Sequence, residues 1–384
     1  MDFTESEEHA ELRAAVAKLV SGWGHGYYAA TTRADGRMGE LWQAMAERGY
    51  LTVNLPVAYG GGGAGIEELA LVCEEAAAGG CPLLLMLVSC AISGELVTRF
   101  GTEEQRRHWL PRAVAGEKMV FAITEPDAGS NSHRIATTAT ANGDRWRLQG
   151  TKYYISGVDE AAAVLVVART GTHRDSGRAQ LSLFVVDTDA PGLDRQVIPV
   201  EIRSPEKQFT LYFDGVEVGA DRLLGTAGDG LRQVFFGLNP ERIMGAALCN
   251  GLGRYALDRA ADYARQRTVW DAPIGAHQGL AHPLAEAKIA LELARLMTTK
   301  AAWLHDHDAP GAGEASNMAK FAAADAAAAA LDRAIQTHGG NGLSSEYGLA
   351  DLWGLVRLLR IAPLSREMIL NFVAQHSLGL ARSY

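Results

Sequence analysis

Cysteine is scarce in this chain of 384 residues, which has only Cys73, Cys81, Cys90 and Cys249 and no pair with Cys-x-x-Cys spacing. Since 48% of the residues are hydrophobic, the chain can build a large core without disulfide bonds, and we expect reduced, buried thiols. Long hydrophobic runs are also missing, because the apolar segment 83–88 is far too short to cross a bilayer. The N-terminus has neither a basic flank nor an apolar signal region, so no membrane insertion and a cytoplasmic location are expected.

Long blocks of one charge sign are absent as well. The net charge of -9 comes from 45 acidic and 36 basic residues that are interspersed, which argues against a nucleic-acid-binding surface. The segment His305-Asp-His307-Asp308 offers two imidazoles without a cysteine or a distant third ligand, so we predict a solvated helix end and no metal site. Gly251-Leu-Gly253 lies inside a helical pattern with no strand before it, which favours close helix packing over a dinucleotide-binding turn.

The first third of the chain is predicted to be a helical bundle. Thr4 and Glu7 have the spacing of a capping box, and a second such pair at Thr102 and Gln105 precedes an apolar stripe. From Gly228 onward, long stretches again carry apolar residues at helical spacing. These stretches cover residues 240–266, 279–307 and 314–337.

Between the two helical parts, the residue pattern is that of a β-domain. Short segments rich in β-branched and aromatic residues alternate with turn-forming residues such as Asn142-Gly143-Asp144. The predicted strands are 119–123, 135–141, 145–149, 151–155, 163–169, 181–186 and 208–213. The expected fold is α+β and mostly α, with an N-terminal helical domain over 1–117, an antiparallel β-domain over 118–226 and a C-terminal helical domain over 227–384.

The segment Phe121-Ala-Ile-Thr-Glu-Pro-Asp-Ala-Gly-Ser-Asn131 joins a short apolar run to a polar turn. Free backbone N–H groups and the Ser130 hydroxyl in such a turn can hold an anion or a polar cofactor. Three further segments follow it: Gly150-Thr-Lys-Tyr-Tyr-Ile-Ser-Gly157, Arg267 with Gln278, and Gln336-Thr-His-Gly-Gly-Asn-Gly342. In this order and at these separations, the four segments resemble the acyl-CoA dehydrogenase family of flavoproteins, and the resemblance covers nearly the whole chain.

The resemblance implies a bound FAD and assigns residues to its flavin ring. The implied contacts are Phe121, Ile123, Thr124, Gly129, Ser130, Tyr154 and Ser156. Tyr154 stands where the family usually has a tryptophan that rests against the isoalloxazine, and Ser156 matches a hydroxyl near the reactive flavin nitrogen. Taken alone, Tyr154 can equally be a strand residue that packs against a cross-strand neighbour.

A second group matches family positions that reach the diphosphate and adenosine of FAD from a neighbouring subunit. It comprises Arg267, Trp270, Gln278, Gln336, Gly339 and Gly340, and the same resemblance adds Ser365 and Glu367 as cofactor contacts. A guanidinium suits a diphosphate because its fork makes paired charge-assisted bonds, whereas a closely approaching backbone needs glycine. A surface arginine at a helix end and a glycine helix stop are the alternatives. The match implies a homo-oligomer, either a tetramer or a dimer, although Val269-Trp270-Asp271 departs from the family pattern.

Members of this family remove the α-proton of an acyl thioester with a glutamate while the β-hydrogen leaves as hydride to FAD. At the position where many members carry this glutamate, the chain has Pro363, which cannot be a base and has no N–H to offer the thioester carbonyl. Either the local register shifts by one residue, or other groups take over this hydrogen bond. The second position used in the family corresponds to Glu241, and the resemblance makes Ser130, Asn239 and Arg242 substrate contacts.

Glu241 has an alternative explanation. Asn239 can cap a helix and Pro240 can occupy its first position, so that Glu241 merely complements the helix dipole. Glu125, in the flavin segment, and Glu367, one helical turn beyond Pro363, are the reserve carboxylates.

The resemblance therefore predicts FAD-dependent α,β-dehydrogenation of an acyl-CoA to a trans-2-enoyl-CoA, with Glu241 as the base. The electrons are expected to pass to an electron-transferring flavoprotein. Three alternatives are a dehydrogenase that acts on an acyl-carrier protein, an acyl-CoA oxidase, and an inactive protein that only binds flavin or acyl-CoA. The four motifs do not separate them, because carrier choice and oxygen access depend on surfaces outside these segments.

Overall fold

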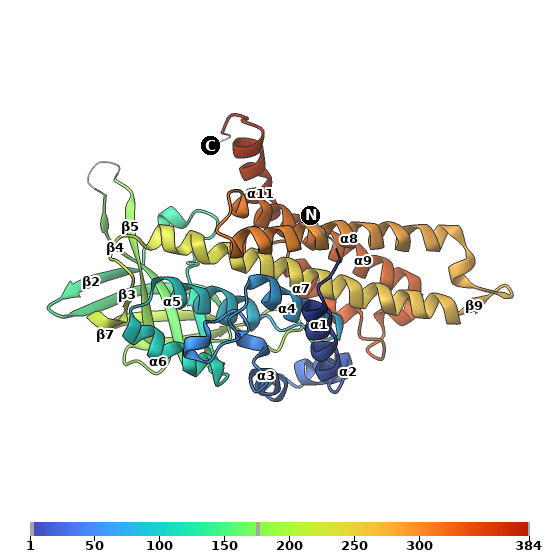
Figure 1. The fold of residues 1–384 in the computed structure, drawn as a ribbon, viewed down its shortest axis with the longest axis horizontal. Coiled ribbons are helices and arrows are strands. Elements are labelled where there is room, and N and C mark those ends of the chain that lie inside the picture. Colours follow the sequence, from blue (N-terminus) through green and yellow to red (C-terminus); the bar gives the residue numbers. More distant parts are fainter. Residues whose placement is uncertain (1–3, 174–176, 383–384) are drawn as a thin grey trace.

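A computed structural model describes residues 4–173 and 177–382 of the chain (Figure 1). Its first part is helical, as predicted. The elements are α1 (Glu7–Val20), α2 (Gly24–Arg33), α3 (Gly39–Ala46), α4 (Ile66–Ala78), the π-helical turn η3 (Met86–Ser93), α5 (Gly94–Phe100) and α6 (Glu103–Val114). The capping box of Thr102 and Gln105 is present at the start of α6. The predicted box of Thr4 and Glu7 is wrong, because α1 begins at Glu7 and the Ser6 hydroxyl accepts the N–H of His9 instead.

The middle part forms one twisted sheet with the strand order β6-β7-β3-β2-β4-β5-β8, to which β1 is added beside β4. The strands are β1 (Met119–Ala122), β2 (Thr138–Asn142), β3 (Arg145–Ser156), β4 (Ala163–Thr172), β5 (Ala179–Asp187), β6 (Leu193–Ile198), β7 (Gln208–Gly219) and β8 (Leu223–Leu224). Most pairings are antiparallel, as expected, whereas β1 and β2 run parallel to β4. Parallel pairing is possible there because long connections separate these strands in the sequence.

Several features of the sheet differ from the strand prediction, and one of them is the short strand β8, which was not predicted. Segments 145–149 and 151–155 belong to the single strand β3, and Gly150 does not interrupt it. A Cβ at Gly150 would lie 2.6 Å from the Thr137 hydroxyl, so the glycine is needed for close approach within the sheet. Strand β6 was not predicted because it is an edge strand whose side chains are mostly exposed, which leaves it without an apolar pattern.

The C-terminal part is again helical. Its elements are α7 (Gly230–Gln266), α8 (Gln278–Asp306), α9 (Ala312–His338), α10 (Trp353–Leu358) and α11 (Arg366–Phe372), with a small hairpin of β9 (Thr268–Val269) and β10 (Ala272–Pro273). Helix α7 runs without a break through Pro240, so Asn239 does not cap a helix. Close packing explains Gly251 and Gly253, since a Cβ would meet the carbonyl of Glu74 at 2.3 Å and the side chain of Leu291 at 2.5 Å.

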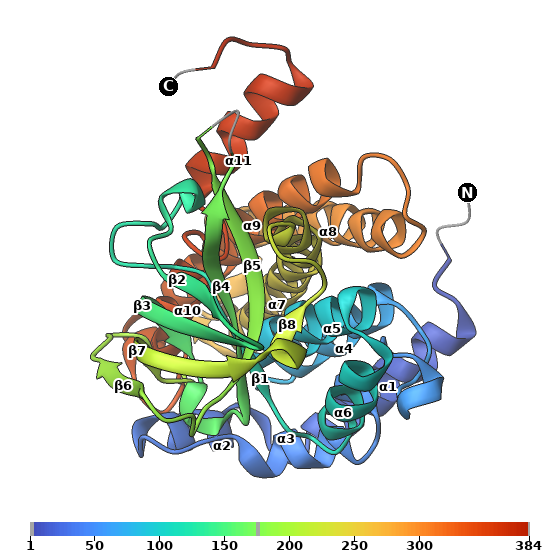
Figure 2. The ribbon, with the colours of Figure 1, turned by 90° about the vertical axis from the view of Figure 1, so that its left-hand side faces the viewer.

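The sheet lies at one end of the long helices α7, α8 and α9, and the β9–β10 hairpin lies at the opposite end (Figure 1). Figure 2 shows α7, α8 and α9 behind and above the sheet, with the N-terminal helices below it and to its right. One hydrophobic core joins side chains from all three parts of the chain. The four cysteines are free and buried, as predicted.

The segment 305–308 forms the exposed end of α8 as predicted, except at His305. His305 is buried, and the carboxylate of Asp306 accepts the N–H groups of Ile66 and Glu67, both at 2.9 Å. These contacts tie the end of α8 to the first turn of α4. Over the residues that the structure describes, no helix has the length and hydropathy needed to span a bilayer.

Candidate active site

The flavin segment 121–131 meets the end of β3 through the backbone. The N–H of Tyr153 donates to the carbonyl of Thr124 over 2.9 Å. Phe121 is buried in β1, Ile123 and Thr124 are half-buried, and Gly129 and Ser130 are exposed. A Cβ at Gly129 would meet no atom within 4 Å, so open space adjoins the turn. The structure thus brings the first two predicted segments side by side.

Tyr154 has an unusual backbone that turns its side chain out of the sheet. Its φ is +58°, and it lies in a bulge between the paired residues Lys152 and Ile155. A left-handed conformation is rare for an aromatic residue and costs about 1–3 kcal/mol, so the surrounding structure must impose it. Tyr154 is 52% exposed and has no register partner among the described strands, and its ring contacts that of the preceding Tyr153 at 4.4 Å. Nearby, Ser156 donates to Gln208 Oε1 over 2.9 Å.

A buried ion pair supports this corner. Lys152 is 0% exposed, and its Nζ lies 2.8 Å from Glu125 Oε1 and 2.9 Å from the carbonyl of Ile123. The Glu125 carboxylate also accepts the N–H groups of Ala136 and Thr137, over 2.7 and 3.0 Å. Burial alone raises the pKa of Glu125, but the Lys152 ammonium and these donors outweigh it and hold the pKa below its usual value. Glu125 is therefore suited to a structural role and poorly suited to accept a proton.

Glu241 lies well inside α7, so it is not a first-turn acid that complements a helix dipole. Burial raises the pKa of Glu241 to about 7, against the opposing charges of Arg242 and Lys320. The side chain keeps some accessible surface, and in the described part of the chain its carboxylate has no hydrogen-bond or ion-pair partner. A partly buried carboxylate with a pKa near neutrality and free oxygens has the properties of a general base.

The two family positions for the catalytic glutamate, at Pro363 and at Glu241, belong to neighbouring parts of the structure. A Cβ at Gly245, one helical turn after Glu241, would be 3.7 Å from Pro363 Cδ. The two positions, far apart in the sequence, therefore converge on one face of α7. Leu364 follows Pro363, and within the described residues its N–H has no hydrogen-bond partner.

The remaining residues predicted near the substrate have defined partners. Arg242 is buried and donates to Asn239 Oδ1 over 3.0 Å, and burial lowers the pKa of Arg242. The Ser365 hydroxyl accepts the N–H of Met368 over 3.3 Å and so caps α11. Glu367 is exposed in the first turn of that helix, where it complements the helix dipole.

The second predicted group gathers at the other end of the bundle. Its members Arg267, Trp270, Gln278, Gln336, Gly339 and Gly340 are all exposed, and Trp270 is 86% exposed. The ring of Tyr263, one turn before Arg267, stacks on His338 at 4.3 Å, which joins the ends of α7 and α9. Gly339 ends α9 with φ +58°, as a glycine helix stop does, and a Cβ added to it or to Gly340 would meet no atom within 4 Å.

These two clusters fit the two ends of FAD. The first cluster offers the hydroxyl of Thr124 and the exposed ring of Tyr154. In the second cluster, Arg267 has no carboxylate partner in the described ranges and belongs to the same group as the glycines whose backbone adjoins open space. In one chain, however, the sheet and the β9–β10 hairpin lie at opposite ends of the long helices (Figure 1). A single chain therefore does not bring the two clusters together.

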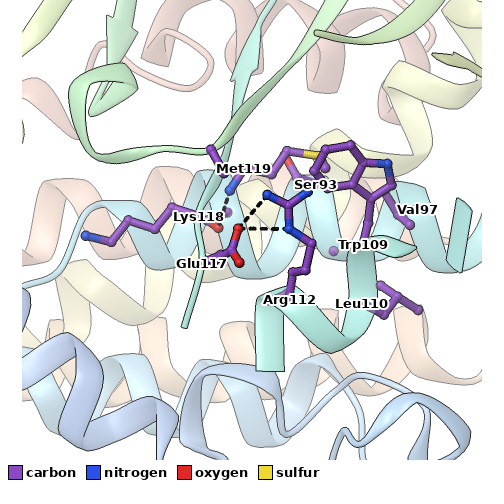
Figure 3. A pocket seen from close by; sticks show the side chains of 12 residues that line it. Ser93, Val97, Trp109, Leu110, Arg112, Glu117, Lys118 and Met119 are labelled. Carbon is purple, nitrogen blue, oxygen red and sulfur yellow. Dashed lines mark hydrogen bonds and ion pairs between the residues drawn. The ribbon is translucent and has the colours of Figure 1, made fainter. Parts of the chain in front are cut away.

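Two pockets elsewhere contain none of the predicted site residues. The first, between α6 and the start of β1, holds about 30 Å³ and is lined by residues such as Ser93, Trp109 and Lys118 (Figure 3). Such a volume accommodates about one or two water molecules. The second holds about 320 Å³ between α2 and the segment 345–348.

Sequence reasoning missed Lys152, Gln208 and Lys320 as residues of this region. Lys152 stands in the quoted Gly-Thr-Lys motif, but most residues of β3 are exposed or half-buried, so the pattern gave no signal that this lysine is buried. Lys320 opens an alanine-rich run that shows only helix propensity. Its burial depends on what packs around the helix.

Comparisons with known proteins agree with the fold. Models of the N-terminal, middle and C-terminal domains of acyl-CoA dehydrogenases match residues 6–117, 120–216 and 228–378. The chain is 56% identical to acyl-CoA dehydrogenase FadE12 of Mycobacterium tuberculosis over 384 residues, which cover 100% of this chain and 99% of that protein.

Two solved structures illustrate the structural likeness. A complex of glutaryl-coenzyme A dehydrogenase with glutaryl-CoA has a TM-score of 0.93 at 28% identity and covers 100% of this chain and 98% of its own. Butyryl-CoA dehydrogenase from Megasphaera elsdenii has a TM-score of 0.89 at 26% identity, with 99% and 100% covered. The chain belongs to the acyl-CoA dehydrogenase family of oxidoreductases.

Proposed function

We propose that this protein removes the α-proton and the β-hydrogen of an acyl-CoA, with Glu241 as base, to give a trans-2-enoyl-CoA. FAD is the cofactor. The observation that carries the proposal is the state of Glu241, whose carboxylate has a pKa of about 7 and no partner among the described residues. Glu241 lies one helical turn from Gly245, which is beside Pro363. A base with a pKa near the working pH combines a high ionised fraction with a strong drive to take the proton.

In this reaction, the α C–H bond breaks toward a Glu241 oxygen, which holds the proton. The electron pair forms the α,β double bond as the β-hydrogen leaves with its own pair. Bound FAD supplies the hydride acceptor. Negative charge that develops on the thioester oxygen requires hydrogen-bond donors. Since Pro363 has no N–H, we assign one donor to the N–H of Leu364, one residue further along the chain, which has no partner within the described ranges.

The site residues divide between the two clusters. Thr124, Tyr154 and Ser156, with Phe121, Ile123, Gly129 and Ser130 beside them, are proposed to hold the flavin ring. The second cluster is proposed to hold the diphosphate and adenosine of a second chain's FAD. It comprises Arg267, Trp270, Gln278, Gln336, Gly339 and Gly340. The acyl-CoA site is proposed to be lined by Ser130, Asn239 and Arg242. The adjoining edge of the cofactor site is proposed to be formed by Ser365 and Glu367.

A homo-oligomer follows from the separation of these clusters. The outer face of α8 supports it, because Ile289, Leu293, Leu296 and Trp303 follow one another at helical intervals and are all about half exposed or more. An apolar stripe of this kind is typical of a surface that another subunit covers. A dimer suffices to complete the FAD site, and a tetramer also covers the stripe. The reduced cofactor is proposed to pass its electrons to an electron-transferring flavoprotein.

Replacement of the base tests the proposal. Glu241→Gln keeps size and hydrogen-bonding capacity but removes the proton acceptor, so anaerobic flavin bleaching by acyl-CoA should slow by roughly 100- to 10,000-fold. FAD content and acyl-CoA binding should be retained. Glu11→Gln, which changes an exposed carboxylate of α1 outside both clusters, is the control and should bleach at the normal rate.

Pro363→Glu in the Glu241→Gln background then returns a carboxylate and an N–H to the same face of α7. Partial recovery of bleaching is expected. Near-normal bleaching in Glu241→Gln alone contradicts the assignment of the base. Stoichiometric peroxide in air identifies an oxidase, and a preference for the same acyl group on a carrier protein identifies that substrate class.

A further inference from the structure

Lys320 is a fully buried lysine at the junction of α7, α9 and the loop before α11. Its side chain is 1% exposed, and its ammonium donates to the carbonyl of Leu364. Among the residues that the structure describes, no carboxylate lies close enough to form an ion pair with it. Buried lysines without an ion-pair partner are rare because removing an ammonium from water is costly.

The loop that Lys320 contacts is fastened to α9 at two further points. Asp325, also on α9, forms an ion pair with Arg360 over 2.8 Å and accepts a hydrogen bond from Arg366 over 3.0 Å. Pro363 in turn lies against Gly245 of α7, one turn from Glu241. The hydrogen bond from Lys320 to Leu364 therefore holds the centre of a loop whose two flanks are held by Asp325.

The charged and titratable groups that face this junction come from all three elements. They are Glu241, Arg242 and Cys249 on α7, Lys320 and Asp325 on α9, and Arg360 and Arg366 on the loop and α11. Burial lowers the pKa of Lys320 to about 8, with Cys249 and Glu241 opposing, so the ammonium stays protonated when Glu241 ionises near pH 7. Its charge then favours the ionised form of Glu241.

We propose that Lys320 is a positioning residue of the dehydrogenation site, which fixes Leu364 beside the thioester position and places a buried positive charge near Glu241. One side chain thus serves both halves of the reaction. Its hydrogen bond orients the residue whose N–H is to stabilise the carbonyl oxygen, and its charge keeps the base ionised at neutral pH. The inference rests on the proposed role of Glu241 as the base.

The test is the pH dependence of anaerobic flavin reduction by acyl-CoA, from about pH 5 to about pH 9. Three variants separate charge from hydrogen bonding. Lys320→Gln keeps a donor for Leu364 but loses the charge, Lys320→Met loses both, and Lys320→Arg keeps both. Asp325→Asn is the control, because it loosens the same loop without removing the ammonium.

Loss of the charge should raise the pH midpoint of reduction by about one unit in Lys320→Gln and Lys320→Met, the lower end of the effect of a nearby opposite charge. At acid pH the rate should then fall roughly tenfold. Lys320→Arg and Asp325→Asn should keep the wild-type midpoint, even where their maximal rates fall. If Lys320→Met does not fold, Lys320→Gln decides alone.

An unchanged midpoint in Lys320→Gln overturns the inference and leaves Lys320 a purely structural residue. If the midpoint is unchanged in Lys320→Gln but Glu241→Gln is inactive, the assignment of Glu241 as the base still holds. Conversely, an active Glu241→Gln variant refutes the proposed base. The two failures are therefore distinguishable.

Discussion

The buried pair of Glu125 and Lys152 gives the sharpest prediction on how the sheet holds the flavin segment. In Glu125→Gln the fully buried ammonium of Lys152 loses the one carboxylate that it contacts among the described residues and keeps the carbonyl of Ile123. Breaking a buried pair from one side costs about 3–5 kcal/mol, because an uncompensated charge remains in the interior. The amide also repels one of the two N–H groups, of Ala136 and Thr137, that the carboxylate now accepts.

This free energy converts to a measurable melting shift. At about 2.1 cal/mol/K per residue, the unfolding entropy of 384 residues is about 0.8 kcal/mol/K. A loss of about 3–5 kcal/mol therefore lowers the unfolding temperature by roughly 4–6 °C, as measured by calorimetry of the FAD-loaded protein. FAD should also dissociate faster, since the segment from Thr124 to Ser130 loses its anchor.

Two comparisons decide the reasoning. Glu292→Gln breaks an exposed pair with Lys288 within one helix and should cost well under 1 kcal/mol. The double variant Glu125→Gln with Lys152→Met removes the stranded charge and should recover part of the loss. A Glu125→Gln melting shift no larger than that of Glu292→Gln refutes the assignment of Glu125 as the anchor.

Two further predictions concern the proton and the cofactor. Flavin reduction by saturating acyl-CoA should rise with pH and reach half its maximum near pH 7. The reason is that Glu241 accepts a proton only when it is ionised, and burial raises its pKa to about 7. Stopped-flow rates that do not change with pH contradict this prediction. Arg267→Ala should weaken FAD binding by about tenfold or more through the loss of a charge-assisted hydrogen bond, and dilution should release FAD and dissociate the oligomer together. A monomer that retains FAD in sedimentation and fluorescence measurements is the contrary outcome.

The sequence determined the order of the secondary structure because the patterns that encode it are local. Helical spacing predicted α7, α8 and α9 to within a few residues, except that α7 starts earlier than expected. Alternation and turn residues predicted the strands that have a buried face. The same approach failed for β6, which lies at an edge, and for Gly150, because the close approach of Thr137 depends on a segment distant in the sequence.

The motifs also identified the family from the sequence alone. Their positions did not decide which carboxylate is placed as a base. The continuity of α7 through Pro240 removed the helix-cap explanation of Glu241, and the ion pair with Lys152 gave Glu125 a structural role. Both results depend on neighbours that are distant in the sequence.

The tertiary structure alone decided the electrostatics and the strain of the site. The sequence does not record whether a lysine is solvated or buried, so only the packing of the fold shows that Lys152 and Lys320 lie in the interior. Likewise, the left-handed backbone of Tyr154 occurs at a bulge, next to the hydrogen bond from Tyr153 to Thr124, and neither is visible in the local sequence. Periodicity records which face of an element is apolar, whereas a pKa or a strained φ depends on all the groups that surround one residue, and those are set by the fold.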